Sequence, residues 1–252
     1  MTDCTIVNEF TLPSKGLVYP KKINPQIKLR SMTTAEEMKR LNHSDRAYKL
    51  MAEVINDCIV EDCGMHVYDM CIPDYQFLLH KLRIVTYGPE YRSSSRCPFC
   101  ATDNEHVINL ETDLKYTEFD IDIFNKYSEI TLPQSKHVIT LRMQSPRILD
   151  DITIKAKELR KSSPGFIGDP AFLITLQNLI SLVDGKKYED FHLDPFIRNL
   201  PMMDTNYILK AAQKLNTSFG LNSDLNPTCT FCGLDYTSSF RITSEFFGPS
   251  ID

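Results

Sequence analysis

Near the N-terminus, the spacing of apolar side chains changes from strand-like to helix-like. Residues 26–30 alternate apolar and polar side chains, as a strand with one buried face does. Residues 34–41 follow a capping-box sequence, which predicts a short helix. Residues 45–59 and 73–87 repeat apolar side chains every three or four positions, so two longer helices are expected there, the second ending at Gly88.

The middle of the chain is rich in β-branched residues and favours strands. Residues 106–110 and 116–123 are expected to be strands, the second with an acidic face. Residues 128–133 and 137–143 flank a short polar turn, and this arrangement predicts a hairpin.

Helical spacing returns after Pro146. Four helices are expected in succession, with Asp150 and Asp204 as N-caps of the first and the last. Their predicted spans are 150–161, 170–183, 190–200 and 204–215. A final β segment is expected over residues 236–247.

Composition places the chain among ordinary globular proteins. It has 252 residues, of which 42% are hydrophobic and 24% charged, and its formal net charge is −5. The acidic balance argues against a nucleic-acid binder, which normally presents a cationic face. No apolar run is long enough to cross a membrane, and the N-terminus lacks the features of a secretory signal. We therefore expect no membrane partner and a reducing, cytoplasmic environment.

Four of the eight cysteines stand in two Cys-x-x-Cys pairs. The pairs are Cys97 with Cys100 and Cys229 with Cys232. In a reducing compartment, paired cysteines at this spacing indicate a metal rather than disulfides. Four thiolates close a tetrahedral Zn²⁺ site and leave no position for a reactive water, so a shared site would be structural. Far more residues separate these pairs than in a compact zinc ribbon, so sharing one ion requires the fold to bring them together.

Other readings of the cysteines remain open at this point. The pairs could be two unrelated knuckles or simply packed thiols, and a thioredoxin-type redox pair is disfavoured because neither pair opens a helix. His106 lies close enough to Cys100 along the chain to replace one cysteine as a ligand.

These patterns together predict an α+β fold. Helical segments would surround a small β region that is closed by a zinc-ribbon-like site of four cysteines. We expect an N-terminal part over residues 1–90, a β-rich module from 91–145 and 226–252, and a helical insertion over 146–225.

No known catalytic motif is present. Asp120 and Asp122 alternate on the expected strand and could bind a cation, although a solvated face is the simpler interpretation. His80 is expected to be a partly exposed helical residue rather than a base. The basic residues near the end of the helix predicted at 150–161 are expected to form its wet face: Lys155, Lys157, Arg160 and Lys161. We therefore predict that the chain is not an enzyme.

Several stretches, taken in order, resemble the baseplate hub assembly family of contractile-tailed phages of the T-even type. In the N-terminal part, the similar residues are 12–16 with Tyr19, 27–30, 33–37 and 58–59. The strongest similarity is the stretch 78–88, which is followed by Tyr91 and the first cysteine pair. The same family has similar middle strands at residues 130–133 and 138–142, and a similar end at Cys229–Cys232 followed by Phe240–Pro249. Residues from about 148 to 225 are not distinctive.

The resemblance implies a late phage protein that acts in the host cytoplasm, and the tail baseplate of the virion is a second expected location. It would help the central hub to assemble by binding other hub and tail proteins, as a chaperone or a minor hub subunit. Phe246 and Phe247 are candidates for an exposed contact surface; the alternative is that they are core residues that close the last strand. A zinc-ribbon nucleic-acid-binding or transcription-related factor is the alternative, and an enzyme with a dispersed carboxylate site is a third.

Overall fold

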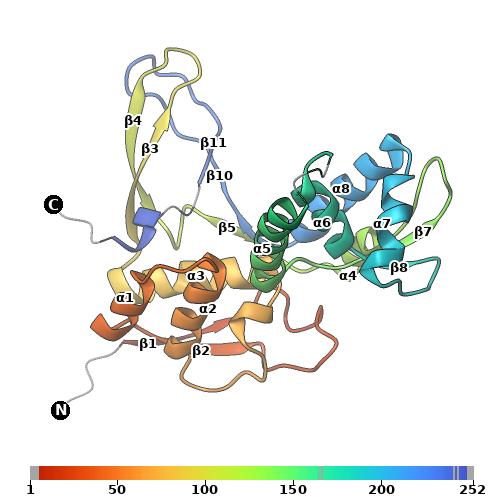
Figure 1. Cartoon of the computed structure of the whole chain (residues 1–252). Coiled ribbons are helices and arrows are strands. Elements are labelled where there is room, and N and C mark those ends of the chain that lie inside the picture. The colour runs from red at the N-terminus through yellow and green to blue at the C-terminus, as the bar shows by residue number, and fades with distance from the viewer. Residues whose placement is uncertain (1–5, 164, 166, 241, 243, 249–252) are drawn as a thin grey trace.

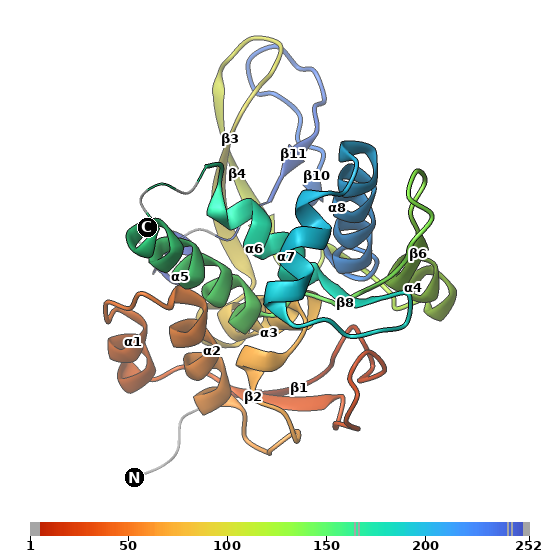
Figure 2. The same cartoon turned by 45° about the vertical axis from the view of Figure 1, so that its right-hand side comes forward.

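The computed structural model describes residues 6–163, 165, 167–240, 242 and 244–248 (Figure 1). Within these residues, helices combine with short antiparallel strands in five small sheets, and the expected α+β class is confirmed. In Figures 1 and 2 an arm made of strands projects from a body made mostly of helices.

The N-terminal part of the body follows the sequence pattern. Strand β1 (Val7–Thr11) pairs antiparallel with β2 (Gln26–Arg30), and the alternation in β2 buries Ile27 and Leu29 completely. The three expected helices are present, and the capping box of the first is formed. They are α1 (Thr34–Arg40), α2 (Ala47–Cys58) and α3 (Ile72–Tyr87), with the 3-10 turn η1 (Val67–Asp69) before the last.

The C-terminal end of the chain completes the core of this part. Phe240, Phe246 and Phe247 pack into the same apolar cluster as α2 and α3. Phe246 and Phe247 are 0% and 3% exposed, so the interpretation of them as core residues is confirmed and that of an exposed contact surface is wrong. The buried Arg83 of α3 fastens them, since its Nε donates to the Phe246 carbonyl at 2.8 Å. Burying these large rings yields more stability than leaving them in water.

The arm consists of two strand pairs that meet at its tip. Strand β3 (Glu90–Arg96) pairs with β4 (Asp103–Asn109), and β10 (Asp224–Leu225) pairs with β11 (Ser238–Ser239). The two pairs lie side by side in both views, although they come from opposite halves of the sequence (Figures 1 and 2). The β segment expected at 236–247 is largely wrong, because the described part holds only β11 and the 3-10 turn η2 (Ser244–Phe247).

A second apolar cluster holds the rest of the body together. Its sheet contains β6 (Glu129–Thr131), β7 (Val138–Leu141) and β8 (Ile180–Val183), with β7 in the centre, so the expected hairpin is confirmed. The accompanying helices are α4 (Ile121–Ser128), α6 (Pro170–Leu179), α7 (Asp190–Arg198) and α8 (Met202–Asn216). Helix α5 (Pro146–Ser162) packs against α6 through a smaller apolar cluster of its own. Strands β5 (Lys115–Thr117) and β9 (Gly220–Asn222) form a further pair at the base of the arm.

Two expected elements change type along their length. The helix predicted over 170–183 ends at Leu179, because Ile180–Val183 pairs with β7 as a strand. A continuous apolar run fits a buried helix or a buried strand equally well, so the pattern could not locate this change. The strand predicted over 116–123 ends at Thr117, and Asp120 then caps α4.

Asp150 and Asp204 do not cap the helices that they were expected to start. Helix α5 starts after Ser145, whose hydroxyl caps it, and α8 starts after Pro201. Asp150 instead accepts the Lys49 N–H of α2 at 2.9 Å, whereas Asp204 accepts the N–H groups of residues 134 and 135, each at 2.8 Å. Both carboxylates therefore join segments that are distant in the sequence.

Candidate metal centre

The first cysteine pair forms a tight turn at the end of β3. The Cys97 N–H donates to the Thr102 carbonyl at 2.9 Å, and the Ala101 N–H donates to the Cys97 carbonyl at 2.9 Å. This turn requires Ala101 at a φ of 59°, in the left-handed region that costs residues other than glycine roughly 1 kcal/mol.

The second cysteine pair repeats the same turn on the other side of the arm. The Cys229 N–H donates to the Leu234 carbonyl at 3.0 Å, and the Gly233 N–H donates to the Cys229 carbonyl at 3.0 Å. Gly233 takes the left-handed position, at a φ of 70°. The two turns are thus equivalent in their backbone bonding, and each directs two sulfurs to the same point.

The four sulfurs meet at distances suited to a metal ion. All four Sγ atoms lie within 4.8 Å of one another. The Sγ atoms of Cys97 and Cys232 are 3.8 Å apart, and those of Cys100 and Cys229 are 3.5 Å apart. Four sulfurs bound to zinc at about 2.3 Å would be separated by about 3.8 Å, whereas a disulfide would need about 2 Å. The fold therefore brings both pairs together, and these four thiols could hold a metal ion.

The side chain of Asn104 connects the two turns. It is 1% exposed, and its amide donates to the Thr102 carbonyl at 3.0 Å. Its Oδ1 accepts the N–H and the hydroxyl of Thr230 at 2.9 and 2.8 Å, and its Nδ2 lies 3.7 Å from the Cys229 Sγ. A buried amide bonded in this way orients a sulfur ligand and fixes the spacing of the turns.

Protein N–H groups favour the ionised form of one thiol. The N–H groups of Cys232 and Phe231 point at the Cys229 sulfur and lower the pKa of its thiol to about 6. Metals bind the thiolate rather than the thiol, so this environment suits a metal ligand.

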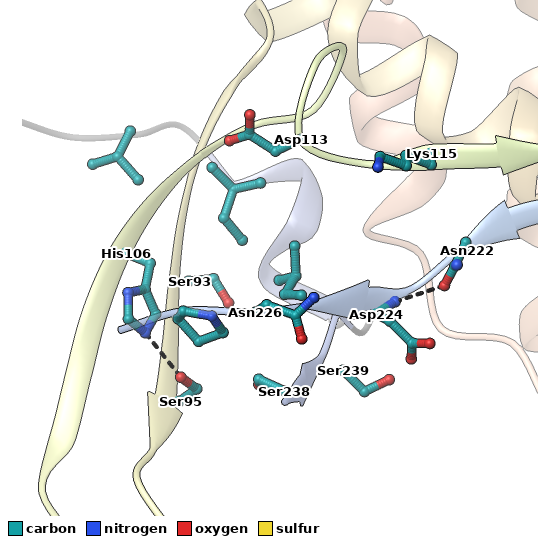
Figure 3. A pocket seen from close by; sticks show the side chains of 14 residues that line it. Ser93, Ser95, His106, Asp113, Lys115, Asn222, Asp224, Asn226, Ser238 and Ser239 are labelled. Atoms are coloured by element: carbon teal, nitrogen blue, oxygen red, sulfur yellow. Dashed lines mark hydrogen bonds between the residues drawn. The ribbon is translucent and has the colours of Figure 1, made fainter. Parts of the chain in front are cut away.

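His106 does not join the cysteine cluster. Its Nε2 lies 2.9 Å from the Ser95 hydroxyl (Figure 3). The Tyr236 hydroxyl lies 3.2 Å from the same Nε2 and 2.6 Å from the Ser95 hydroxyl. The Tyr236 ring packs with Cys97 and Cys229. His106 and Ser95 therefore support the arm just below the sulfurs, and the structure gives His106 no place among the candidate ligands.

The remaining candidates for chemistry have structural surroundings. Asp120 accepts the N–H groups of residues 122 and 123 as a helix cap, and among the described residues only the four cysteines form a possible metal cluster. His80 is fully buried, so the expectation that it is partly exposed is wrong. Burial lowers its pKa to about 3, and its ring is stacked at 13° to Phe246. The basic residues near the end of α5 are exposed to solvent, as predicted. Two of them, Lys157 and Arg160, form ion pairs.

Asn104 and Tyr236 were not among the candidate residues predicted from the sequence. Asn104 stands four residues after Cys100 and Tyr236 four residues after Cys232, in matching positions of the two arm segments. This matching offset after each pair is the signal that could have found them.

The structure thus combines an α+β body with an arm in which four converging thiols could hold a metal ion. The chain belongs to the family described as T4 bacteriophage base plate protein, which matches residues 5–248 and thus nearly the whole chain. No curated protein and no solved structure matches it significantly. No helix in the described part of the chain is long and apolar enough to span a membrane.

Proposed function

We propose that this baseplate protein assists assembly of the central hub of a contractile tail, by binding other hub and tail proteins. The family match carries the proposal, because it extends through both segments of the arm and through the helices between them. The role would be that of an assembly chaperone or a minor hub subunit, exercised in the host cytoplasm, and it needs no catalytic residue.

The metal centre would serve this role as a structural Zn²⁺ site. The donor set of four sulfurs, their separations of 3.5 and 3.8 Å and the two matching turns support zinc. The ion would fasten the end of the chain to its middle through ligands contributed by both segments. Within the β-rich module expected at 91–145 and 226–252, we propose that the ion pins the arm, which consists of the β3–β4 hairpin and the segment from β10 to β11. Strands β6 and β7 instead join β8 in the sheet of the body, beside the helices expected at 146–225.

Deletion of the gene from the phage genome tests the assembly role. We expect cells infected with the deletion phage to accumulate tail parts without complete hubs, and expression of the protein from a plasmid to restore them. Electron microscopy and the protein composition of purified baseplates provide the readout. Normal hubs without the protein would contradict the proposal, and salt-sensitive retention of the purified chain on DNA would then favour the nucleic-acid alternative.

A further inference from the structure

A polar cavity lies in the arm below the cysteines. Its volume is about 600 Å³, and it lies between the β3–β4 hairpin and β10 (Figure 3). The walls carry small hydroxyl side chains, among them Ser93 and Ser95 of β3 and Ser238 and Ser239 of β11. Strand pairs that face each other ordinarily fill the space between them with larger side chains. The arm therefore contains a cavity that atoms of another molecule could fill.

One wall of the cavity is a strand edge that is open at Asn226, whereas the Asp224 N–H on the same edge already donates to the Asn222 Oδ1 at 2.9 Å. The Ser223 carbonyl accepts the Phe240 N–H at 2.7 Å, and the Pro227 carbonyl accepts the Tyr236 N–H at 3.0 Å. Because antiparallel strands bond through alternate residues, Asn226 turns its main-chain N–H and carbonyl away from β11. Neither group has a hydrogen-bond partner among the described residues. Asn226 lines the cavity, so these groups are available there.

The open edge continues a sheet that the chain itself begins. Strand β5 pairs with β9 up to the pair of Lys115 and Asn222. Beyond Asn222 the strand runs on into β10, whereas the chain before Lys115 turns away at Asp113 (Figure 3). An added segment in the cavity would extend the pairing of β5 along β10. Adding a strand to an exposed edge is a common way to bind an extended peptide.

The charges at this end of the cavity indicate the chemistry of such a segment. Lys115 forms no ion pair within the described part of the chain, and Figure 3 shows its amino group directed toward the pocket. The Asp113 carboxylate already accepts the Asn109 N–H and the Thr112 hydroxyl, each at 2.9 Å. The Asp224 carboxylate is directed away from Lys115 (Figure 3). A carboxylate on the incoming segment would therefore complement Lys115.

We propose that this cavity binds an extended segment of another baseplate protein, which adds a strand to β10 and places a carboxylate against Lys115. The proposal rests on the proposed function, because it names the surface through which the protein would hold its partner. Main-chain bonds to Asn226 would supply general affinity, and the small hydroxyl wall and Lys115 would select the segment.

Short overlapping peptides from the other baseplate proteins of the same phage provide the probe. We expect at least one acidic peptide to bind the full-length, zinc-loaded chain and to slow hydrogen exchange at the Asn226 amide. Ser93→Leu fills the cavity and should weaken binding about tenfold or more. Lys115→Glu should weaken it about fivefold at low salt, with a smaller effect at high salt. Lys187→Glu removes an equally exposed lysine outside the cavity and should leave binding unchanged.

The comparison is valid only if all three variants keep the zinc content and circular dichroism of the parent. The cavity proposal is overturned if no peptide binds or if both cavity variants bind like the parent. Co-purification with intact baseplate proteins separates the two proposals. If Ser93→Leu still co-purifies with them, the cavity is the wrong surface, although the proposed function stands. If the parent chain co-purifies with none, the proposed function fails as well.

Discussion

The body and the tip of the arm are held together by different means. Two large apolar clusters stabilise the body, and the one around α3 alone contains more than twenty buried residues. The cluster at the tip has only three buried members, Cys97, Cys229 and Tyr236, with Cys100 and Cys232 packed against them. Hydrophobic burial can hold the body, whereas the tip has too little apolar surface to fix two segments so distant in sequence. We infer that the tip depends on its metal and that the body does not.

Removal of the metal should have the largest effect and should be confined to the arm. Binding of structural zinc contributes apparent free energies of about 10 kcal/mol or more. We expect a chelator, or Cys97→Ser, to abolish zinc binding and to speed hydrogen exchange in residues 97–104 and 229–236, while α3 stays protected. Cys63→Ser is the matched control, because Cys63 is also buried but lies outside the cluster of four cysteines. The Cys63→Ser variant should keep the zinc content of the parent. Loss of protection throughout α3 on chelation would refute the separation of arm and body.

Truncation of a core residue should give the opposite result. Leu82 of α3 is fully buried, and Leu82→Ala should lower the free energy of unfolding by about 2–5 kcal/mol. Zinc content under native conditions should remain that of the parent. Leu17→Ala, at a side chain that is 63% exposed, should change stability by less than about 0.5 kcal/mol. Denaturant unfolding with parallel metal analysis measures both quantities.

Acid should destabilise the body through His80. Desolvation lowers the pKa of His80 to about 3 in the folded protein, against about 6.5 in an unfolded chain. The unfolded state then binds more protons between these two pKa values. His80 therefore leaves the free energy of unfolding unchanged above pH 6.5 and lowers it by about 1.4 kcal/mol per pH unit below that value. In His80→Leu this part of the slope should vanish. A variant with an unchanged slope between pH 6.5 and 5, measured on zinc-free protein, would show that other groups cause the acid sensitivity.

The two cysteine turns allow the smallest and sharpest test. Ala101 and Gly233 hold equivalent left-handed positions, so opposite substitutions should have opposite effects. We expect Gly233→Ala to lower the free energy of unfolding of the arm by about 1 kcal/mol. Ala101→Gly should raise the same free energy by up to a similar amount. No atom lies within 4 Å of a Cβ added at Gly233, so backbone conformation alone is tested. Effects of the same sign would show that the turns are not equivalent.

The sequence predicted the elements that local pattern determines. The spacing of α2 and α3, the capping box of α1 and the hairpin of β6 and β7 all follow from residues close together in the chain, and all are confirmed. The change from α6 to β8 was missed, because partners in β7 determine it and the apolar run does not. Asp150 was misassigned for a similar reason, since the helix that it caps begins about a hundred residues earlier.

The candidate site was predicted in its ligands and missed in its surroundings. Spacing identified the four cysteines, because two thiols on one tight turn are a local feature. That both turns reach one point depends on the whole fold. The bonds of Asn104 to both turns and the burial of His80 against Phe246 likewise join distant segments. The offset of Asn104 from Cys100 marks the residue but not its bonds, and no local pattern marks the burial of His80.

Zinc content combined with X-ray absorption at the zinc edge tests the central claim most directly. The full-length chain would be purified under reducing conditions without chelators. We predict one zinc per chain, bound by four sulfurs at about 2.3 Å, with no nitrogen ligand. A chain without metal in which all four knuckle thiols react freely, or a spectrum that requires a histidine ligand, would contradict the account.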